Sequence, residues 1–267
     1  MTTMDVRSTS RAEPTVAARA RDVLNSEWTK LRSVRSTYWT LLIAAVTGVG
    51  GSIILAYSTA SGGNTAFDPV ASIFVAWLEY PVLAVGILGV LVFTSEYSTG
   101  LIRSTFAAVP QRLAVLAAKA GVVGIVALCF GELLALVSFL SSEAILSGHQ
   151  GGVSLSHPGV PGAVMAAGFF LFVVAMVGLG LGAIIRHSAG AIAALPALIY
   201  VPLIVLILPS PWNNRIGRFT LLVAAYQAVS LHPRHDLLSP TVSMLVLIAW
   251  PAVVLAVACL LITRRDA

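Results

Sequence analysis

Apolar residues along this chain are gathered into long blocks separated by short polar stretches. An α-helix rises about 1.5 Å per residue, so about 20 apolar residues cross roughly 30 Å of hydrocarbon. Blocks of this length predict six membrane-spanning helices, over Tyr38–Tyr57, Val70–Phe93, Leu113–Leu140, Gly162–Ile185, Ala189–Leu208 and Thr241–Ile262. The expected fold is therefore an all-α polytopic membrane protein.

Two boundaries in this pattern allow alternatives. The fourth and fifth blocks are separated only by Arg186, His187 and Ser188, so one re-entrant hairpin is an alternative, although the summed length favours two spans. The first block has spanning length and follows a 37-residue segment, which favours a retained span over a cleaved signal peptide. Residues 1–18 are polar and aperiodic, which predicts a mobile tail before a single transmembrane domain over residues 19–267.

Composition agrees with a lipid environment. Hydrophobic types make up 58% of the 267 residues and charged types only 10%, whereas soluble domains carry about 25% charged residues. Cys129 and Cys259 lie inside apolar blocks, where a thiol behaves as a small hydrophobe. The sequence contains no phosphate-binding loop and no zinc-protease or serine-hydrolase motif. We therefore expect no enzyme active site, metal site or cofactor in this chain.

The distribution of basic residues predicts the orientation and argues against nucleic-acid binding. With a cytoplasmic N-terminus, 13 of the 16 Lys and Arg residues lie on the inside. The outside then holds three, and the short outer loops Ser58–Pro69 and Ser141–Pro161 hold none. Cytoplasmic loops are enriched in Lys and Arg, so both termini are expected on the cytoplasmic side of a cell membrane. The inside set is Arg7, Arg11, Arg19, Arg21, Lys30, Arg32, Arg35, Arg103, Arg112, Lys119, Arg186, Arg264 and Arg265.

The stretch Val23–Ser36 predicts an amphipathic helix before the first span. Leu24, Trp28, Leu31 and Val34 follow helical spacing on one stripe. The cations Lys30, Arg32 and Arg35 lie off that stripe. Such a helix is expected in the membrane surface, with Trp28 at the headgroups and the cations toward phosphates. The alternative is a positive flank that only orients the first span.

A polar stretch, Thr94–Pro110, interrupts the apolar pattern between the second and third spans. Glu96 favours a helix start, and Tyr97, Leu101 and Thr105 are spaced to share one helix face. Gly100 permits close backbone approach. The predicted orientation makes residues 94–112 a cytoplasmic loop that suits a docking partner, with a plain solvated loop as the alternative.

Glu96–Arg103 reads EYSTGLIR and resembles the cytoplasmic coupling helix of ABC-2-type transporter permeases, which reads approximately E-Y-x-x-G-T-x-R. Leu24–Ser36 is similar to the start of such permeases in actinobacteria, and Arg103–Arg112 also fits. One departure is Leu101, where many relatives carry Thr. The resemblance implies that the coupling contacts to the ATPase are Glu96, Tyr97, Ser98, Thr99, Gly100, Leu101 and Arg103.

The resemblance further implies the membrane subunit of an ATP-driven exporter in a bacterial cytoplasmic membrane. A separate cytosolic ATPase, in two copies, would bind ATP and Mg, and a second permease subunit would complete the pore. A hydrophobic or amphipathic substrate such as a drug, lipid, peptide or polysaccharide is expected. Family members also fold the segment corresponding to Pro209–Pro240 as paired re-entrant or surface helices, although a simple outer loop is the alternative.

Two acids and two glycines inside the spans are further candidates. Glu79 and Glu132 either line a translocation route or are neutralised within the bundle. If these acids carried protons, the chain would be a proton-coupled secondary transporter, which is the first alternative to the exporter. A non-transporting membrane scaffold is the second alternative. Gly178 and Gly182 allow close helix approach, which we expect within one subunit rather than between two.

Overall fold

The computed structural model describes residues 16–62, 69–77, 81–108, 111–147, 152–232 and 237–264, and this part of the chain is helical without a strand. Six of its helical segments are long and apolar enough to cross a membrane, which identifies a multi-pass membrane protein. They are Arg35–Ser61, Pro81–Ser98, Arg112–Leu146, Val160–Ile185, Ser188–Ile207 and Pro240–Arg264. The predicted all-α membrane fold is confirmed at this level.

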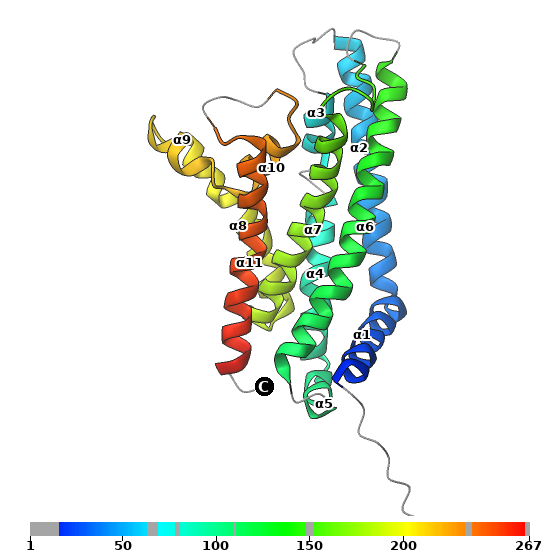
Figure 1. The fold of residues 1–267 in the computed structure, drawn as a ribbon, viewed down its shortest axis with the longest axis vertical. Coiled ribbons are helices and arrows are strands. Elements are labelled where there is room, and N and C mark those ends of the chain that lie inside the picture. The colour runs from blue at the N-terminus through cyan, green and yellow to red at the C-terminus, as the bar shows by residue number, and fades with distance from the viewer. Residues whose placement is uncertain are drawn as a thin grey trace, which may run out of the picture.

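The six spanning segments run through the bundle in alternating directions (Figure 1). In chain order the elements are α1 (Val16–Ser33), α2 (Arg35–Gly62), α3 (Pro69–Trp77), α4 (Pro81–Ser98), α5 (Leu101–Ala108), α6 (Arg112–Leu146), α7 (Val160–Ile185), α8 (Ser188–Tyr200), the 3₁₀ helix η1 (Val201–Ile207), α9 (Trp212–Gly217), α10 (Leu221–Val229) and α11 (Pro240–Arg264). The helices α1 and α5 and the C-terminal end of α11 lie at the same end of the bundle, which we name the α1 end. Helices α3 and α9 lie toward the opposite end, the α9 end.

Helix α7 forms the centre of the bundle, with α4, α6, α8, α10 and α11 packed around it. It shares a glycine seam with α4. A Cβ added at Gly178 would collide with the Gly86 carbonyl oxygen, and one at Gly182 would lie 2.8 Å from the Val90 carbonyl oxygen. Gly89 meets the Ala175 carbonyl oxygen in the same way. In this structure Gly178 and Gly182 thus pack against α4 within one subunit.

The second predicted span, Val70–Phe93, is covered by two described helices. Helix α3 ends at Trp77 and α4 begins at Pro81, and residues 78–80 lie outside the described part. Proline suits the first turn of a helix, where its missing amide hydrogen is not needed. Helix α4 ends at Ser98 rather than at Phe93, so it includes the first five residues of the polar stretch Thr94–Pro110.

The N-terminal boundary also differs from the prediction, since α1 begins at Val16 and so includes three residues of the expected tail. Residues 1–15 lie outside the described part. The fourth and fifth spans are two separate helices, because Arg186 takes a left-handed conformation (φ 60°) and ends α7 before α8 begins.

The fifth span changes its winding partway. It begins as α8, contains Pro196, and continues from Val201 as the 3₁₀ helix η1, which has Pro202 in its first turn. Along η1 the side chains of Val201, Ile204 and Ile207 are exposed by 56%, 61% and 84%, respectively, so this stretch has an apolar surface that suits lipid.

Two short helices, α9 and α10, occupy the segment predicted to carry paired outer helices. Helix α10 is packed against α7 and α11 and buries most of its residues. Trp250 of α11 donates a hydrogen bond from Nε1 to the Phe219 carbonyl oxygen over 3.1 Å. In contrast, Trp212 and Ile216 of α9 are exposed, and α9 extends away from the bundle (Figure 1).

Candidate functional site

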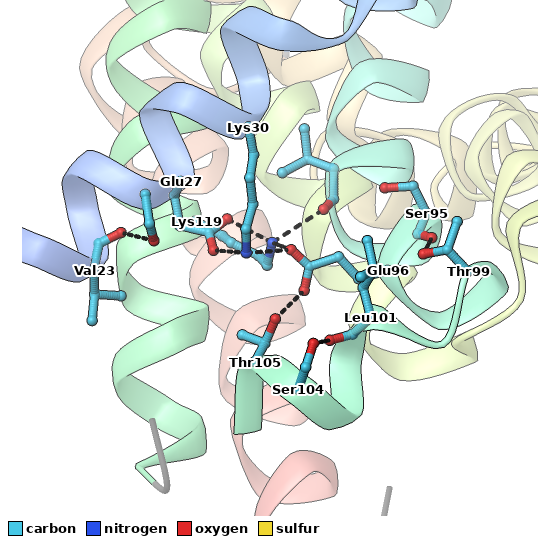
Figure 2. A network of polar contacts seen from close by, with 12 residues as sticks. Val23, Glu27, Lys30, Ser95, Glu96, Thr99, Leu101, Ser104, Thr105 and Lys119 are labelled. Atoms are coloured by element: carbon cyan, nitrogen blue, oxygen red, sulfur yellow. Dashed lines mark hydrogen bonds and ion pairs between the residues drawn. The ribbon is translucent and has the colours of Figure 1, made fainter. Parts of the chain in front are cut away.

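A buried cluster of four charged side chains joins three helices at the α1 end (Figure 2). Glu27 and Lys30 come from α1, Glu96 from the last turn of α4, and Lys119 from the third turn of α6. The side chains of Lys119, Glu27 and Glu96 are only 1%, 3% and 7% exposed, whereas that of Lys30 is 43% exposed. We refer to these four residues as the charge cluster.

Lys119 is the buried centre of the charge cluster. Its Nζ donates to Glu27 Oε2 and to Glu96 Oε1, each over 2.6 Å, and to the Val92 carbonyl oxygen over 3.4 Å. An ammonium group has three donors, and here each has an acceptor. Such complete pairing is what allows a lysine to remain buried, because an isolated ammonium in an apolar interior would cost several kcal/mol.

Lys30 completes a closed ring of ion pairs. Its Nζ donates to Glu27 Oε1 over 2.7 Å and to Glu96 Oε1 over 2.8 Å. Burial lowers the pKa of Lys30, but the hydrogen bonds and charges of Glu27 and Glu96 outweigh burial and raise that pKa above its usual value. Lys30 therefore stays charged at neutral pH, and its contribution to stability is lost only as the pH rises above about 10.4.

Helix α6 is long enough to place the charge cluster near a membrane surface. Its 35 residues extend about 52 Å, well beyond the roughly 30 Å of a hydrocarbon core. Lys119 lies seven residues after Arg112, or about 10 Å from the beginning of the helix. The cluster thus fits the level at which hydrocarbon gives way to headgroups.

The polar stretch after Glu96 is an elbow between two helices rather than one helical face. Gly100 has φ 72°, a left-handed conformation that ends α4 and lets the chain turn into α5. We call residues 99–104 the elbow. Because of this turn, the predicted common face of Tyr97, Leu101 and Thr105 is wrong.

These three residues instead have three different environments. Tyr97 stacks on Phe93 at 5.6 Å between ring centroids, and the Arg186 guanidinium lies 5.4 Å from its ring centroid. Leu101 is 57% exposed. Thr105 donates from Oγ1 to Glu96 Oε2 over 3.4 Å, so it links α5 to the charge cluster.

This geometry buries one of the predicted coupling contacts and exposes others. Glu96 is buried near the end of α4 and does not begin a helix, contrary to the sequence-based expectation. Ser98, Thr99, Gly100 and Leu101 are exposed at the turn, where a partner could reach them. The side chain of Arg103 lies outside the described part of the structure.

The helix predicted before the first span is present as α1, but its faces differ from expectation. Leu31 is buried against Leu88 and Val122, whereas Trp28 is 48% exposed, as lipid or headgroup contact requires. Arg32 and Arg35 are exposed. Lys30 does not point toward lipid phosphates as predicted, because Glu27 and Glu96 pair with it inside the protein.

Of the two predicted intramembrane acids, Glu79 lies outside the described residues and Glu132 lies within them. Glu132 is half-buried on α6, where it packs against Gly168 of α7.

Sequence reasoning missed Glu27 and Lys119 as members of a site. One signal was present in each case. Apart from Arg112 at its start, the first 20 residues of α6 contain one charged residue, Lys119. A lysine buried in such an apolar helix needs a carboxylate partner. Glu27 precedes Lys30 by three residues, a spacing that places both on one side of a helix.

Comparison with protein-family models gives no match to this chain, and comparison with curated proteins gives none either. The resemblance of Glu96–Arg103 to a permease coupling helix therefore stays a prediction.

Proposed function

We propose that this chain is the membrane-spanning permease subunit of an ATP-binding cassette exporter. A separate cytosolic ATPase, present in two copies, supplies the energy, and a second permease subunit, identical or related, completes the pore. The cargo is a hydrophobic or amphipathic compound. The observation that carries this proposal is the attachment of an exposed elbow to a buried charge cluster that joins α1, α4 and α6.

The elbow is exposed at its tip and anchored at both ends. Thr99 and Leu101 are exposed, whereas Ile102 is only 4% exposed. On the α4 side, Glu96 accepts hydrogen bonds from both lysines of the charge cluster. On the α5 side, Thr105 bonds to the same carboxylate. A push on the elbow would therefore move α4 and α5 together rather than deform a loose loop.

The charge cluster extends that movement to other helices. Lys119 connects Glu96 to α6 and pairs with Glu27 of α1, and Lys30 of α1 pairs with Glu96. Arg186, at the end of α7, lies over the Tyr97 ring. Coupling of ATP hydrolysis to transport requires two packed states of the bundle with different affinities for the cargo. A connection from one exposed contact to several spans suits that requirement.

The placement of basic residues supports a cytoplasmic position for the elbow. Lys30, Arg32, Arg112, Arg186 and Arg264 all belong to helix ends or loops at the α1 end. Arg112 donates from Nη1 to the Ile262 carbonyl oxygen over 3.3 Å, which ties the beginning of α6 to the end of α11. Basic residues concentrate on the cytoplasmic side of membrane proteins, where a cytosolic ATPase would be available.

Affinity purification from native membranes tests the proposal. We expect a phosphate-loop ATPase to co-purify with the wild-type chain and to be lost from the Leu101→Arg variant, which changes the exposed tip of the elbow. Leu155→Arg is the matched control, because Leu155 is 37% exposed in the segment between α6 and α7, away from the elbow. Repeated absence of any such ATPase, or equal loss in both variants, would count against the proposal.

The same preparation allows an orientation control. A cysteine introduced by Thr99→Cys should react with a membrane-impermeant reagent only after the cells are permeabilised. Ser154→Cys, in the segment that connects α6 and α7, should react in intact cells. The opposite pattern would place the elbow outside the cell, where ATP-driven coupling has no partner.

A further inference from the structure

Helix α9 and the turn that follows it present an exposed apolar face. Trp212, Ile216 and Phe219 follow helical spacing, and Arg218 keeps a helical conformation (φ −60°), so these three side chains share one side. They are 57%, 46% and 47% exposed, respectively. Large apolar side chains gathered on one exposed face mark a surface that meets lipid or another chain.

Contacts with two spans fix the position of this face. A Cβ added at Gly217 would lie 2.7 Å from Leu206 Cδ2, so α9 packs directly on η1. The Phe219 carbonyl oxygen accepts the hydrogen bond from Trp250 of α11. The fifth span, Ser188–Ile207, extends about 33 Å, which brings its far end to the edge of a hydrocarbon core of roughly 30 Å. Helix α9 is therefore held where hydrocarbon gives way to headgroups at the α9 end.

The charge carried by this segment is positive. Arg215 is exposed and Arg218 is half-buried, and in the described structure Arg218 Nε is buried without a hydrogen-bond partner. From Ala144 to His235 the sequence contains no Asp or Glu, so no carboxylate from this part of the chain balances the two arginines. Guanidinium groups match phosphate oxygens in both charge and geometry. The segment is thus complementary to an anionic phosphate.

Two observations favour a lipid surface over a second copy of this chain. The exposed apolar side chains of η1, Val201, Ile204 and Ile207, directly precede α9, so its face continues a surface that already suits lipid. Tryptophan is enriched at the boundary of hydrocarbon and headgroups, and interfacial helices combine such residues with basic ones. A symmetric contact of two copies through α9 would instead bring four arginines together without a carboxylate from this segment.

We propose that α9 is an interfacial anchor that binds anionic phospholipid headgroups in the leaflet at the α9 end. Trp212, Ile216 and Phe219 enter the boundary of headgroups and acyl chains, and Arg215 and Arg218 bind the phosphates. Because α9 packs on η1 and is bonded to α11, this anchor sets the depth of the fifth and sixth spans. The proposal does not depend on an ATPase partner or on the transported compound.

Photolabelling of the full-length chain in lipid nanodiscs tests this site. Discs of phosphatidylcholine and phosphatidylglycerol in equal amounts receive a trace of one of these two lipids with a diazirine near its headgroup, and the labelled peptides are mapped by mass spectrometry. A basic residue near an anionic surface changes lipid affinity by roughly fivefold. With two arginines, we expect the phosphatidylglycerol probe to label residues 212–219 about 5- to 25-fold more than the phosphatidylcholine probe.

Three pairs of substitutions locate the preference. Arg215→Gln with Arg218→Gln should bring the labelling ratio of residues 212–219 to about 1. Arg32→Gln with Arg35→Gln removes two exposed arginines at the α1 end and should leave that ratio unchanged. Arg215→Lys with Arg218→Lys keeps both charges and should keep most of the preference, which separates the effect of charge from a loss of packing.

The fluorescence of Trp212, isolated as the difference between the wild type and Trp212→Phe, tests the apolar face. In discs that hold a single chain, brominated lipids should quench this signal, whereas aqueous iodide should quench it little. Discs that hold two chains should give the same result, because lipid rather than a second copy covers the face.

Three results would overturn the proposal. Equal labelling of residues 212–219 by the two probes would remove the anionic preference, and equal losses in the two glutamine pairs would show an effect of net charge alone. Protection of Trp212 from iodide only in two-chain discs would show that a second copy covers α9. All three readings use a folded, reconstituted chain, and the lysine pair provides a reading if the glutamine pair at α9 does not fold.

Discussion

The two parts of α4 are held in opposite ways. In its middle, Gly89 meets the backbone of Ala175 and Gly86 meets the backbone of Gly178 on α7, with no space for a carbon added at Gly89 or at Gly178. Near its end, Glu96 is held by charges from two other helices through long, flexible lysine side chains. The seam fixes the distance between two helices, whereas the charge cluster fixes which side chains pair.

This difference has a consequence for movement. A backbone contact without side chains cannot lengthen gradually, because close packing is lost within a fraction of an ångström. Lysine side chains can rotate and follow a carboxylate while they keep the ion pair. We therefore expect α4 and α7 to move as one body, and α1 to be the element that can shift relative to them.

The largest expected effect comes from the centre of the charge cluster. Lys119→Met leaves Glu27 and Glu96 with only Lys30 between them, so one buried negative charge is unbalanced. Removal of one partner from a buried ion pair costs about 3–5 kcal/mol. A loss of this size should appear as a lower midpoint when the purified protein is unfolded by dodecyl sulfate in detergent micelles.

A double-mutant cycle provides the control for Lys119. Glu96→Gln combined with Lys119→Met restores neutrality, because Glu27 and Lys30 remain as a pair. The double variant should be more stable than the sum of the two single effects predicts, by about 0.5–3 kcal/mol. Additive effects would show that the two side chains do not interact in the membrane protein.

A substitution in the glycine seam between α4 and α7 should cause a smaller loss of stability. Gly178→Ala places a methyl group against the Gly86 carbonyl oxygen, and overpacking of this kind costs about 1–3 kcal/mol. Gly162→Ala on the same helix is the matched control, because no atom lies within 4 Å of the added carbon. That variant should be neutral or gain up to about 1 kcal/mol, since alanine favours helix. The unfolding midpoints of both, measured side by side, check the prediction.

If Gly178→Ala were as stable as the control, the seam would not be tight enough to hold α4 and α7 together. The contrast between a fixed seam and an adaptable charge cluster would then lose its basis.

The smallest expected effect is at Glu132, the acid that packs on Gly168 away from the charge cluster. Glu132→Gln keeps the shape of the side chain, so the free energy of unfolding should change by less than about 0.5 kcal/mol. If ATP drives transport, accumulation of a fluorescent amphipathic dye in inverted membrane vesicles should also be little changed. Abolished uphill accumulation at unchanged stability would instead favour the proton-coupled alternative.

Hydropathy and length predicted the spans because burial in lipid depends on local composition. Thus Gly162–Ile185 was predicted within two residues of the observed start of α7 and with its observed end. The second span was less predictable, because α4 continues through five polar-stretch residues to Ser98, beyond the predicted end at Phe93. In the same way, Gly100 was recognised as permissive, but its left-handed conformation depends on where α5 is held.

The charge cluster could be predicted only in part. Glu96 and Lys30 were both singled out, yet nothing local indicates that residues separated by 66 positions share an ion pair. Lys119 was counted among basic residues of the inside, where its charge fitted the orientation rule. That rule uses only the number of charges, whereas the pairing depends on how α1 crosses α4 and α6.

The 3₁₀ conformation of η1 changes both the length and the surface shape of the fifth span. Seven residues rise about 14 Å in this form, compared with about 10.5 Å in an α-helix, so the span gains about 3.5 Å without an added residue. Residues three apart are eclipsed in a 3₁₀ helix, so Val201, Ile204 and Ile207 stack into a straight ridge instead of a spiral. An extended hydrocarbon tail can lie flush against such a ridge over its whole length.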